Sequence, residues 1–199
     1  MNKKVLITCP PMLLHIELFR QKFSEINIEI TTPDVVQTLS EEQLISSIHE
    51  YDGWIIGDDP ATRGVFESGK KGNLKAAVKW GVGVDNVNFK ACKELGIKIT
   101  NTPGMFGKEV ADLAMNYILG LSRDSYFIDR EIRNERWPKP AGISLAGKTV
   151  GILGLGDIGL NIAKRSRAFD LNIIGWDPFK KEYPEYINYQ KNWPSGVNL

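Results

Sequence analysis

An apolar strand pattern followed by three closely spaced glycines limits this chain to very few folds. Thr149–Leu153 is a β-branched and apolar run typical of a buried parallel strand. Gly154, Gly156 and Gly159 follow it, and residues 173–176 form a second apolar run. Between them, a helix is predicted whose apolar face contains Ile158, Ile162, Ala163, Ala168 and Phe169. Strand, glycine turn, helix and strand in this order predict a βαβ unit that binds a dinucleotide.

Each glycine has its own mechanical role in such a unit. Gly154 permits the tight turn, Gly156 lets the backbone approach a pyrophosphate, and Gly159 lets the helix pack closely on the strand. The helix N-terminus, near Asp157 and Ile158, is expected to direct backbone N–H groups and the positive end of its dipole at the phosphates. These five positions form the predicted pyrophosphate site.

Asp177 follows the second strand at roughly the 20-residue spacing expected of a ribose-binding acid. A carboxylate there accepts hydrogen bonds from the ribose 2′-hydroxyl and repels a 2′-phosphate, so NAD is favoured over NADP. Lys180 and Lys181 weaken this preference slightly. The alternative is an ordinary α/β turn whose glycines serve packing alone.

Composition excludes several classes of function. The 199 residues suffice for one large domain or two small ones, and 25 basic and 24 acidic residues give a net charge of only +1. This balance gives no electrostatic reason to expect binding to nucleic acid or to a membrane. Pro10 and Pro11 interrupt the first apolar run well below signal-peptide or transmembrane length, so a cytoplasmic location is expected. Cys9 and Cys92 have no disulfide or metal-ligand spacing and are predicted to be small buried or strand-end residues, and no metal site is predicted.

The N-terminal half alternates between strand and helix patterns. Strands are predicted at residues 4–8, 27–31, 53–56, 74–80 and 97–100. Helices are predicted at residues 12–24 and from a Ser40–Gln43 capping box to about residue 51. This alternation predicts an open parallel sheet, which binds ligands at the carboxyl ends of its strands.

A boundary between two domains is predicted between about residues 100 and 145. Apolar residues recur at helical spacing over residues 107–133, which indicates one long helix or two consecutive helices. Residues 137–142 contain two prolines and a glycine and are expected to act as a hinge. Residues 179–199 show neither helical nor strand periodicity and are predicted to be a loop.

Four ordered motifs resemble the D-isomer-specific 2-hydroxyacid dehydrogenases, and in particular their phosphoglycerate dehydrogenase branch. The motifs are Trp80-Gly81-Val82-Gly83-Val84-Asp85-Asn86-Val87, Asn101-Thr102-Pro103-Gly104, the segment 142–151, and the glycine turn with Trp176-Asp177-Pro178. The resemblance implies a flavodoxin-like parallel-sheet substrate domain (1–103), linking helices and a hinge (104–141), and an incomplete Rossmann dinucleotide-binding domain (142–199).

The resemblance also assigns roles to the loop that follows the predicted strand at 74–80. It implies that the backbone amides of Gly81, Val82 and Gly83 face the substrate carboxylate, and that Val82 also lies at the nicotinamide end of the cofactor. Successive amides of this kind form an anion-binding nest. The alternative is a tight turn in which Asp85 and Asn86 cap the next helix. Arg63 is either a substrate-facing cation or a solvated surface residue.

The acid/base chemistry of the family is expected to lie outside this chain. Family members use an arginine, a glutamate and a histidine, and the resemblance places all three beyond residue 199. His15 and His49 are predicted to be surface or helix-flank residues. The incomplete second sheet favours a fragment, which alone is expected to be inactive. Family members dimerise through their cofactor domains, so the helices at residues 107–133 are the predicted homodimer interface.

Three functional hypotheses follow. The first is an NAD-dependent oxidoreductase that transfers hydride between nicotinamide and C2 of a small 2-hydroxy or 2-keto acid. The second is a non-catalytic NAD-binding or NAD-sensing protein of the same fold. The third is a structural or interaction protein, which would have no affinity for the cofactor.

Overall fold

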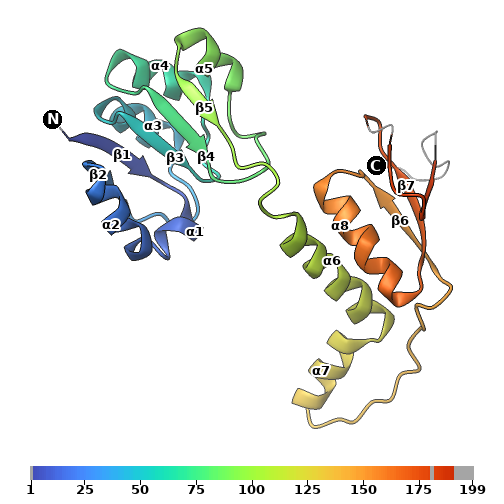
Figure 1. Cartoon of the computed structure of the whole chain (residues 1–199). Helices are drawn as coiled ribbons and strands as arrows, with labels where there is room; N and C mark the ends of the chain where they lie inside the picture. The colour runs from blue at the N-terminus through green and yellow to red at the C-terminus, as the bar shows by residue number, and fades with distance from the viewer. Residues whose placement is uncertain (1, 180–181, 191–199) are drawn as a thin grey trace. The chain divides into compact units, whose positions relative to one another are not determined.

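The computed structural model describes residues 2–179 and 182–190 and divides the chain into two compact units, Met1–Met105 and Phe106–Leu199. Each unit has its own parallel β-sheet (Figure 1). Lys180, Lys181 and the part of the predicted loop at residues 191–199 lie outside the described residues. Among the residues described, no helix has the length and apolar character needed to cross a bilayer.

The first unit has a five-stranded parallel sheet in the order β2-β1-β3-β4-β5. Its strands are β1 (Lys3–Ile7), β2 (Ile28–Thr31), β3 (Gly53–Ile56), β4 (Ala76–Lys79) and β5 (Lys98–Thr100). This is the flavodoxin-like strand order, which confirms the predicted fold class. Every predicted strand is present, and most differ from the prediction only at their ends.

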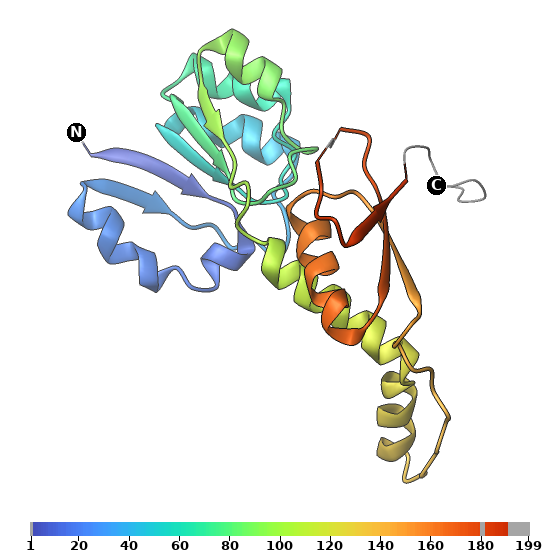
Figure 2. The same ribbon diagram turned by 45° about the vertical axis from the view of Figure 1, so that its right-hand side comes forward.

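Helices cover both faces of this sheet (Figures 1 and 2). They are α1 (Pro10–Leu13), α2 (Glu17–Glu25), α3 (Glu41–Ser47), α4 (Arg63–Lys71) and α5 (Phe89–Leu95), with a 3-10 turn at Ile48–Glu50. One core contains Trp54, Ile56 and Phe66, and the core on the opposite face contains Ile7, Cys9 and Met12. A sheet buried on both faces explains why its strands read as apolar runs.

Two helix predictions in this unit need correction. The helix expected at residues 12–24 is two helices, because tight i→i−3 turns interrupt it: the His15 N–H donates to the Met12 carbonyl and the Ile16 N–H to the Leu13 carbonyl. The helix expected to reach residue 51 ends at Ser47 and continues as the 3-10 turn. Its predicted capping box is confirmed, since the side chains of Ser40 and Gln43 accept each other's backbone N–H.

The second unit has a three-stranded parallel sheet in the order β6-β7-β8. The strands are β6 (Thr149–Leu153), β7 (Asn172–Trp176) and β8 (Ile187–Tyr189), and α8 (Asp157–Ser166) connects the first two. This order matches the first half of a Rossmann sheet and confirms that part of the predicted fold class. The loop prediction is wrong at β8, where Ile187 pairs with Ile173 and is buried. A three-residue strand is too short to show a period.

Of the two alternatives for residues 107–133, the structure has two consecutive helices, α6 (Gly107–Ser122) and α7 (Ser125–Arg133). They are separated at Asp124, whose φ of 55° is left-handed. Helix α6 runs beside α8 in both views (Figures 1 and 2). Their contact includes an ion pair between Arg165 Nε and Asp112 Oδ1 at 2.5 Å. The α6 helix is therefore an integral part of the second unit.

Candidate functional site

The glycine turn lies at the carboxyl end of β6, where open parallel sheets bind ligands. Gly154 has a φ of +91°, and its N–H donates to the Trp176 carbonyl at 2.8 Å, which ties the turn to β7. A Cβ on Gly159 would lie 1.9 Å from the Gly154 carbonyl oxygen. A Cβ on Gly156 would meet no atom within 4 Å, so the backbone there is open to a ligand. The turn thus requires glycine for a different reason at each position.

Helix α8 begins at Asp157 beside this turn, with Gly156 as its N-cap. The first N–H groups of a helix have no intrahelical acceptor, so this end of α8 suits an anion. Asp157 Oδ1 accepts from the Asn161 side chain at 3.0 Å, and a Cβ on Gly107 would lie 2.0 Å from Asp157 Oδ2. The Asp157 carboxylate therefore lies against the start of α6.

The apolar face predicted for this helix is partly wrong. Ile158 is 38% exposed, and Ala168 and Phe169 are also exposed. The buried positions are instead Gly159, Ala163 and Ser166, and Leu160 and Ile162 are half-buried. Small residues occupy the buried face because the helix closely approaches the glycine turn at Gly159.

The carboxylate of Asp177 reaches the glycine turn. Its Oδ2 accepts from the Leu155 N–H at 2.7 Å, and its Oδ1 accepts from the Phe179 N–H at 2.8 Å. The structure therefore brings together the predicted ribose-binding acid and the predicted pyrophosphate loop. An ionised carboxylate accepts up to about four hydrogen bonds, so these contacts are compatible with ribose binding.

The loop Gly81–Gly83 lies at the carboxyl end of β4 and is held by the segment after β5. The Gly81 N–H donates to Thr102 Oγ1 at 3.0 Å, and the Thr102 N–H donates back to the Gly81 carbonyl at 3.1 Å. The Asn101 side chain donates to the Val82 carbonyl at 3.0 Å. Because the Gly81 N–H is already bonded, the amides of this loop that suit a ligand are those of the exposed Val82 and Gly83.

The alternative role for Asp85 and Asn86 as helix caps is wrong. The N-cap of α5 is Asn88, whose side chain accepts from the Ala91 N–H at 2.8 Å. The Asn86 side chain donates to the carbonyls of Gly57 at 3.2 Å and Asp59 at 2.7 Å. It therefore links the loop after β4 to the loop after β3.

Two buried polar groups that the sequence reasoning missed fix the loop after β3. Asp59 is fully buried and accepts from Thr8 Oγ1 and from the N–H groups of Gly57 and Leu39. Lys79 is also buried and donates to the Gly57 carbonyl and to Asp58. The sequence does show that Lys79 is a charged residue at the end of an apolar strand. That pattern does not identify its partner Asp58, which is more than 20 residues away.

Three other polar residues singled out in the sequence lie at the surface. Arg63 pairs with Glu67 and Glu94, which agrees with the surface alternative. His15 and His49 are exposed, as predicted. Within the described ranges, no three His, Cys, Asp or Glu side chains gather as a metal-binding group.

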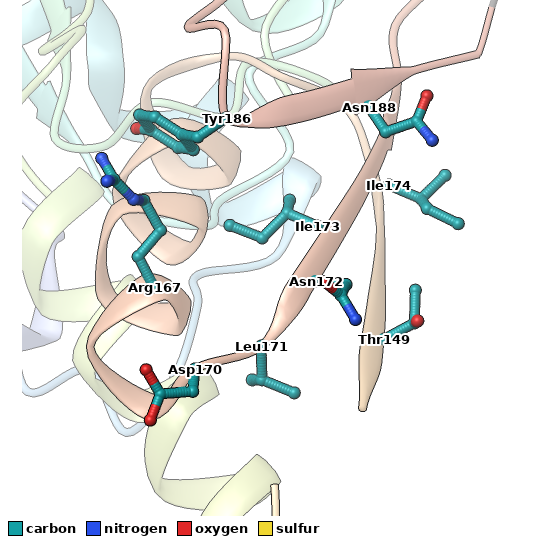
Figure 3. A pocket seen from close by; sticks show the side chains of 9 residues that line it. All are labelled: Thr149, Arg167, Asp170, Leu171, Asn172, Ile173, Ile174, Tyr186 and Asn188. Carbon is teal, nitrogen blue, oxygen red and sulfur yellow. The ribbon is translucent and has the colours of Figure 1, made fainter. Parts of the chain in front are cut away.

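A cavity of about 530 Å³ lies in the second unit, and Figure 3 shows the side chains that line it. It is lined by Thr149, Arg167, Asp170, Leu171, Asn172, Ile173, Ile174, Tyr186 and Asn188. The Arg167 guanidinium lies 4.4 Å from the centre of the Tyr186 ring. Thr149 and Asn172 begin their strands, so the cavity is at the opposite end of the sheet from the glycine turn. The end of the sheet that binds ligands in such folds is the carboxyl end, which excludes this cavity as the dinucleotide site.

A comparison with protein families identifies the catalytic domain of the D-isomer specific 2-hydroxyacid dehydrogenases over residues 5–187. The chain is 36% identical over 165 residues to a hydroxypyruvate reductase of Thermotoga maritima, covering 81% of the chain and 52% of that protein. It is 35% identical over 191 residues to a D-3-phosphoglycerate dehydrogenase of Methanocaldococcus jannaschii, covering 94% of the chain and 34% of that protein. The chain thus spans about a third to a half of these relatives.

A solved structure from Polaromonas sp., named as a D-isomer specific 2-hydroxyacid dehydrogenase, NAD-binding, has the same fold. The TM-score is 0.81 at 25% identity, and the match covers 96% of the chain and 61% of that structure.

Proposed function

Because the chain belongs to the D-isomer specific 2-hydroxyacid dehydrogenase family, we propose that it is part of an NAD-dependent oxidoreductase. The proposed reaction transfers hydride between nicotinamide and C2 of a small 2-hydroxy or 2-keto acid, a class that includes phosphoglycerate. The observation that carries this proposal is the contact between Asp177 and the glycine turn, because it joins the two parts of a dinucleotide site.

The residues of the second unit fit NAD. Gly154, Gly156 and Gly159 give the turn its shape and leave its backbone open, and Asp157 and Ile158 begin the helix that faces the pyrophosphate. Asp177 would receive the ribose hydroxyls and repel a 2′-phosphate. When bound, NAD supplies a hydride acceptor, or as NADH a hydride donor. This part of the chain would bind and orient the cofactor.

The first unit is proposed to bind the substrate. The N–H groups of Val82 and Gly83 would receive its carboxylate, while Thr102 holds the Gly81 backbone in place. Val82 would also contact the nicotinamide end of the cofactor. The proposed domains are those inferred from the resemblance: residues 1–103 for substrate, 104–141 as the link and 142–199 for NAD. Helix α6 of this link packs on α8, so it belongs to the same compact unit as the NAD-binding part.

The arginine, glutamate and histidine that the resemblance requires are not assigned to residues of this chain. We therefore expect the 199-residue chain to bind NAD without catalysing turnover. The whole protein is proposed to be a cytoplasmic homodimer that binds neither nucleic acid nor membrane.

Isothermal titration calorimetry of the chain with NAD tests the cofactor proposal. We expect NAD to bind more tightly than NADP. We expect Gly156→Ala to lower the affinity for NAD about tenfold, because the new methyl group occupies the approach to the backbone. That methyl group meets no protein atom within 4 Å, so the only expected loss of stability is the cost of alanine at the α8 N-cap, about 1 kcal/mol or less.

Gly151→Ala is the matched control, because its Cβ also meets no atom within 4 Å and it lies within β6, before the turn. Absence of NAD binding by the unmodified chain would contradict the cofactor proposal. NAD binding without turnover by the protein as isolated from its source would favour the non-catalytic alternative.

A further inference from the structure

The last residue of β4, Lys79, carries a buried ammonium group that the proposed function does not use. Its side chain is only 5% exposed. The Nζ donates to the Gly57 carbonyl at 2.5 Å and to Asp58 Oδ1 at 2.8 Å. A Cβ on Gly81 would lie 3.3 Å from Lys79 Cε, so the lysine stem passes beside the first residue of the substrate loop. The buried cation next to that loop is therefore already paired with Asp58.

This ion pair lines a small cavity beside the substrate loop. The cavity has a volume of about 300 Å³ and is lined by Asp58, Lys79, Trp80, Gly81, Gly83, Asp85 and Asn86. Its lining contains one ammonium group and two carboxylates, so negative charge is in excess. This excess of carboxylate charge disfavours an additional anionic group beside it. Because the Asp58 side chain is 80% exposed and Asp85 is also exposed, mobile ions screen part of this repulsion.

The segment after β3, which leads into α4, places no further cation among the residues that line this cavity. Its arginine, Arg63, is the first residue of α4 and pairs with Glu94 of α5 and with Glu67. A phosphate group carries close to two negative charges and is usually received by arginines or by several donors. Lys79 itself is held by Asp58, whose position next to Gly57 keeps the carboxylate close to the ammonium at a high effective concentration.

We propose that Asp58 determines substrate specificity by neutralising Lys79, so that the cavity accepts 2-hydroxy or 2-keto acids with small uncharged side chains and excludes phosphorylated ones. This inference rests on the proposed function and narrows it. The single carboxylate of an acceptable substrate binds the amides of Val82 and Gly83. If a phosphorylated acid binds through its carboxylate in the same way, its phosphate is repelled by the carboxylates of Asp58 and Asp85, which line the cavity.

Backbone amide resonances of the ¹⁵N-labelled chain test this proposal directly. Gly81, Val82 and Gly83 are followed while glycerate or 3-phosphoglycerate is added at matched ionic strength. We expect glycerate to shift these resonances in the unmodified chain, and 3-phosphoglycerate to bind more weakly. Asp58→Asn should strengthen 3-phosphoglycerate binding about tenfold relative to glycerate, which corresponds to about 1.4 kcal/mol.

Three further variants make the result specific to the charge at Asp58. Asp58→Glu keeps the carboxylate and should keep the discrimination. Asp34→Asn removes an exposed carboxylate that does not line the cavity, and it should also leave discrimination unchanged. Asp58→Ser replaces Asp58→Asn if the amide variant loses its dispersed spectrum, because serine also removes the charge and keeps an acceptor for Lys79.

Equal binding of the two acids by the unmodified chain would overturn the inference and leave the substrate loop intact as a proposal. The inference is also overturned if Asp34→Asn changes the selectivity between the two acids as much as Asp58→Asn does. If neither acid shifts the three resonances, the substrate role of the loop fails, and the specificity inference fails with it. The cofactor proposal is then judged separately by the NAD titration.

Discussion

Gly159 is the residue whose side chain the glycine turn tolerates least. A Cβ there would lie 1.9 Å from the Gly154 carbonyl oxygen, which is backbone and cannot rotate away. We expect Gly159→Ala to displace the turn, to destabilise the fold by about 1–3 kcal/mol as overpacking does, and to weaken NAD binding. Chemical denaturation and NAD titration of the same sample measure the two effects.

The contrast with Gly156→Ala separates packing from binding. In that variant NAD affinity should fall with only the small loss of stability expected of alanine at a helix N-cap, whereas in Gly159→Ala affinity should fall together with a larger loss of stability. Gly151→Ala serves as the control for both. A Gly159→Ala protein with unchanged stability and NAD affinity would contradict the role given to this close approach.

Residue roles were predictable where neighbours in the sequence carry them. Gly154, Gly156 and Gly159 form one turn, and their spacing is sufficient to indicate it. Lys79 and Thr102 could not be assigned in the same way, because each acts through a partner more than 20 residues distant. Strand order brings such pairs together, and single-sequence periodicity contains no information about it.

At the scale of elements, α6 presents an apolar stripe that the second unit does not cover. Val110, Leu113, Tyr117 and Leu121 are between 39% and 72% exposed and recur at helical spacing. A stripe of this kind favours an interface, which agrees with the proposed homodimer. We expect Leu113→Glu to shift the protein from dimer to monomer in sedimentation velocity, because the charge would be buried in the interface.

Leu18→Glu is the matched control, since Leu18 is 70% exposed on α2 in the other unit. It should leave the sedimentation coefficient unchanged. A monomeric unmodified protein at high concentration, or equal effects of the two variants, would argue against α6 as the interface.

Element types were predicted more reliably than their ends and interruptions. The Ser40 capping box and the strand at Thr149–Leu153 are local patterns, and both are present. The break at Asp124 leaves no signal in apolar periodicity because it depends on one left-handed residue. Strand β8 was missed because its stability comes from pairing with β7 rather than from its own three residues.

At the scale of the whole molecule, the lowered pKa values of several carboxyl groups predict a loss of stability in acid. Hydrogen bonds from Lys75, Arg133 and Arg136 lower the pKa of Asp52, Asp129 and Glu131, and a backbone hydrogen bond lowers the pKa of Glu42. A carboxyl group with a lowered folded-state pKa stabilises the fold above its unfolded pKa, and this contribution is lost as the pH falls through the folded value.

Because the ordinary pKa values of these groups are 3.8 and 4.5, the free energy of unfolding should be steady near neutral pH and fall below about pH 4.5. Urea unfolding from pH 7 to pH 3 measures this. Asp52→Asn should reduce the acid dependence, since Asp52 accepts from both Lys75 Nζ and the Lys4 N–H, whereas Asp34→Asn should leave it intact. Salt should weaken the effect, because Lys75 and both partners of the Arg133–Asp129 pair are largely exposed and mobile ions screen them. Stability that is constant down to pH 3 would show that these ion pairs do not contribute to holding the fold together.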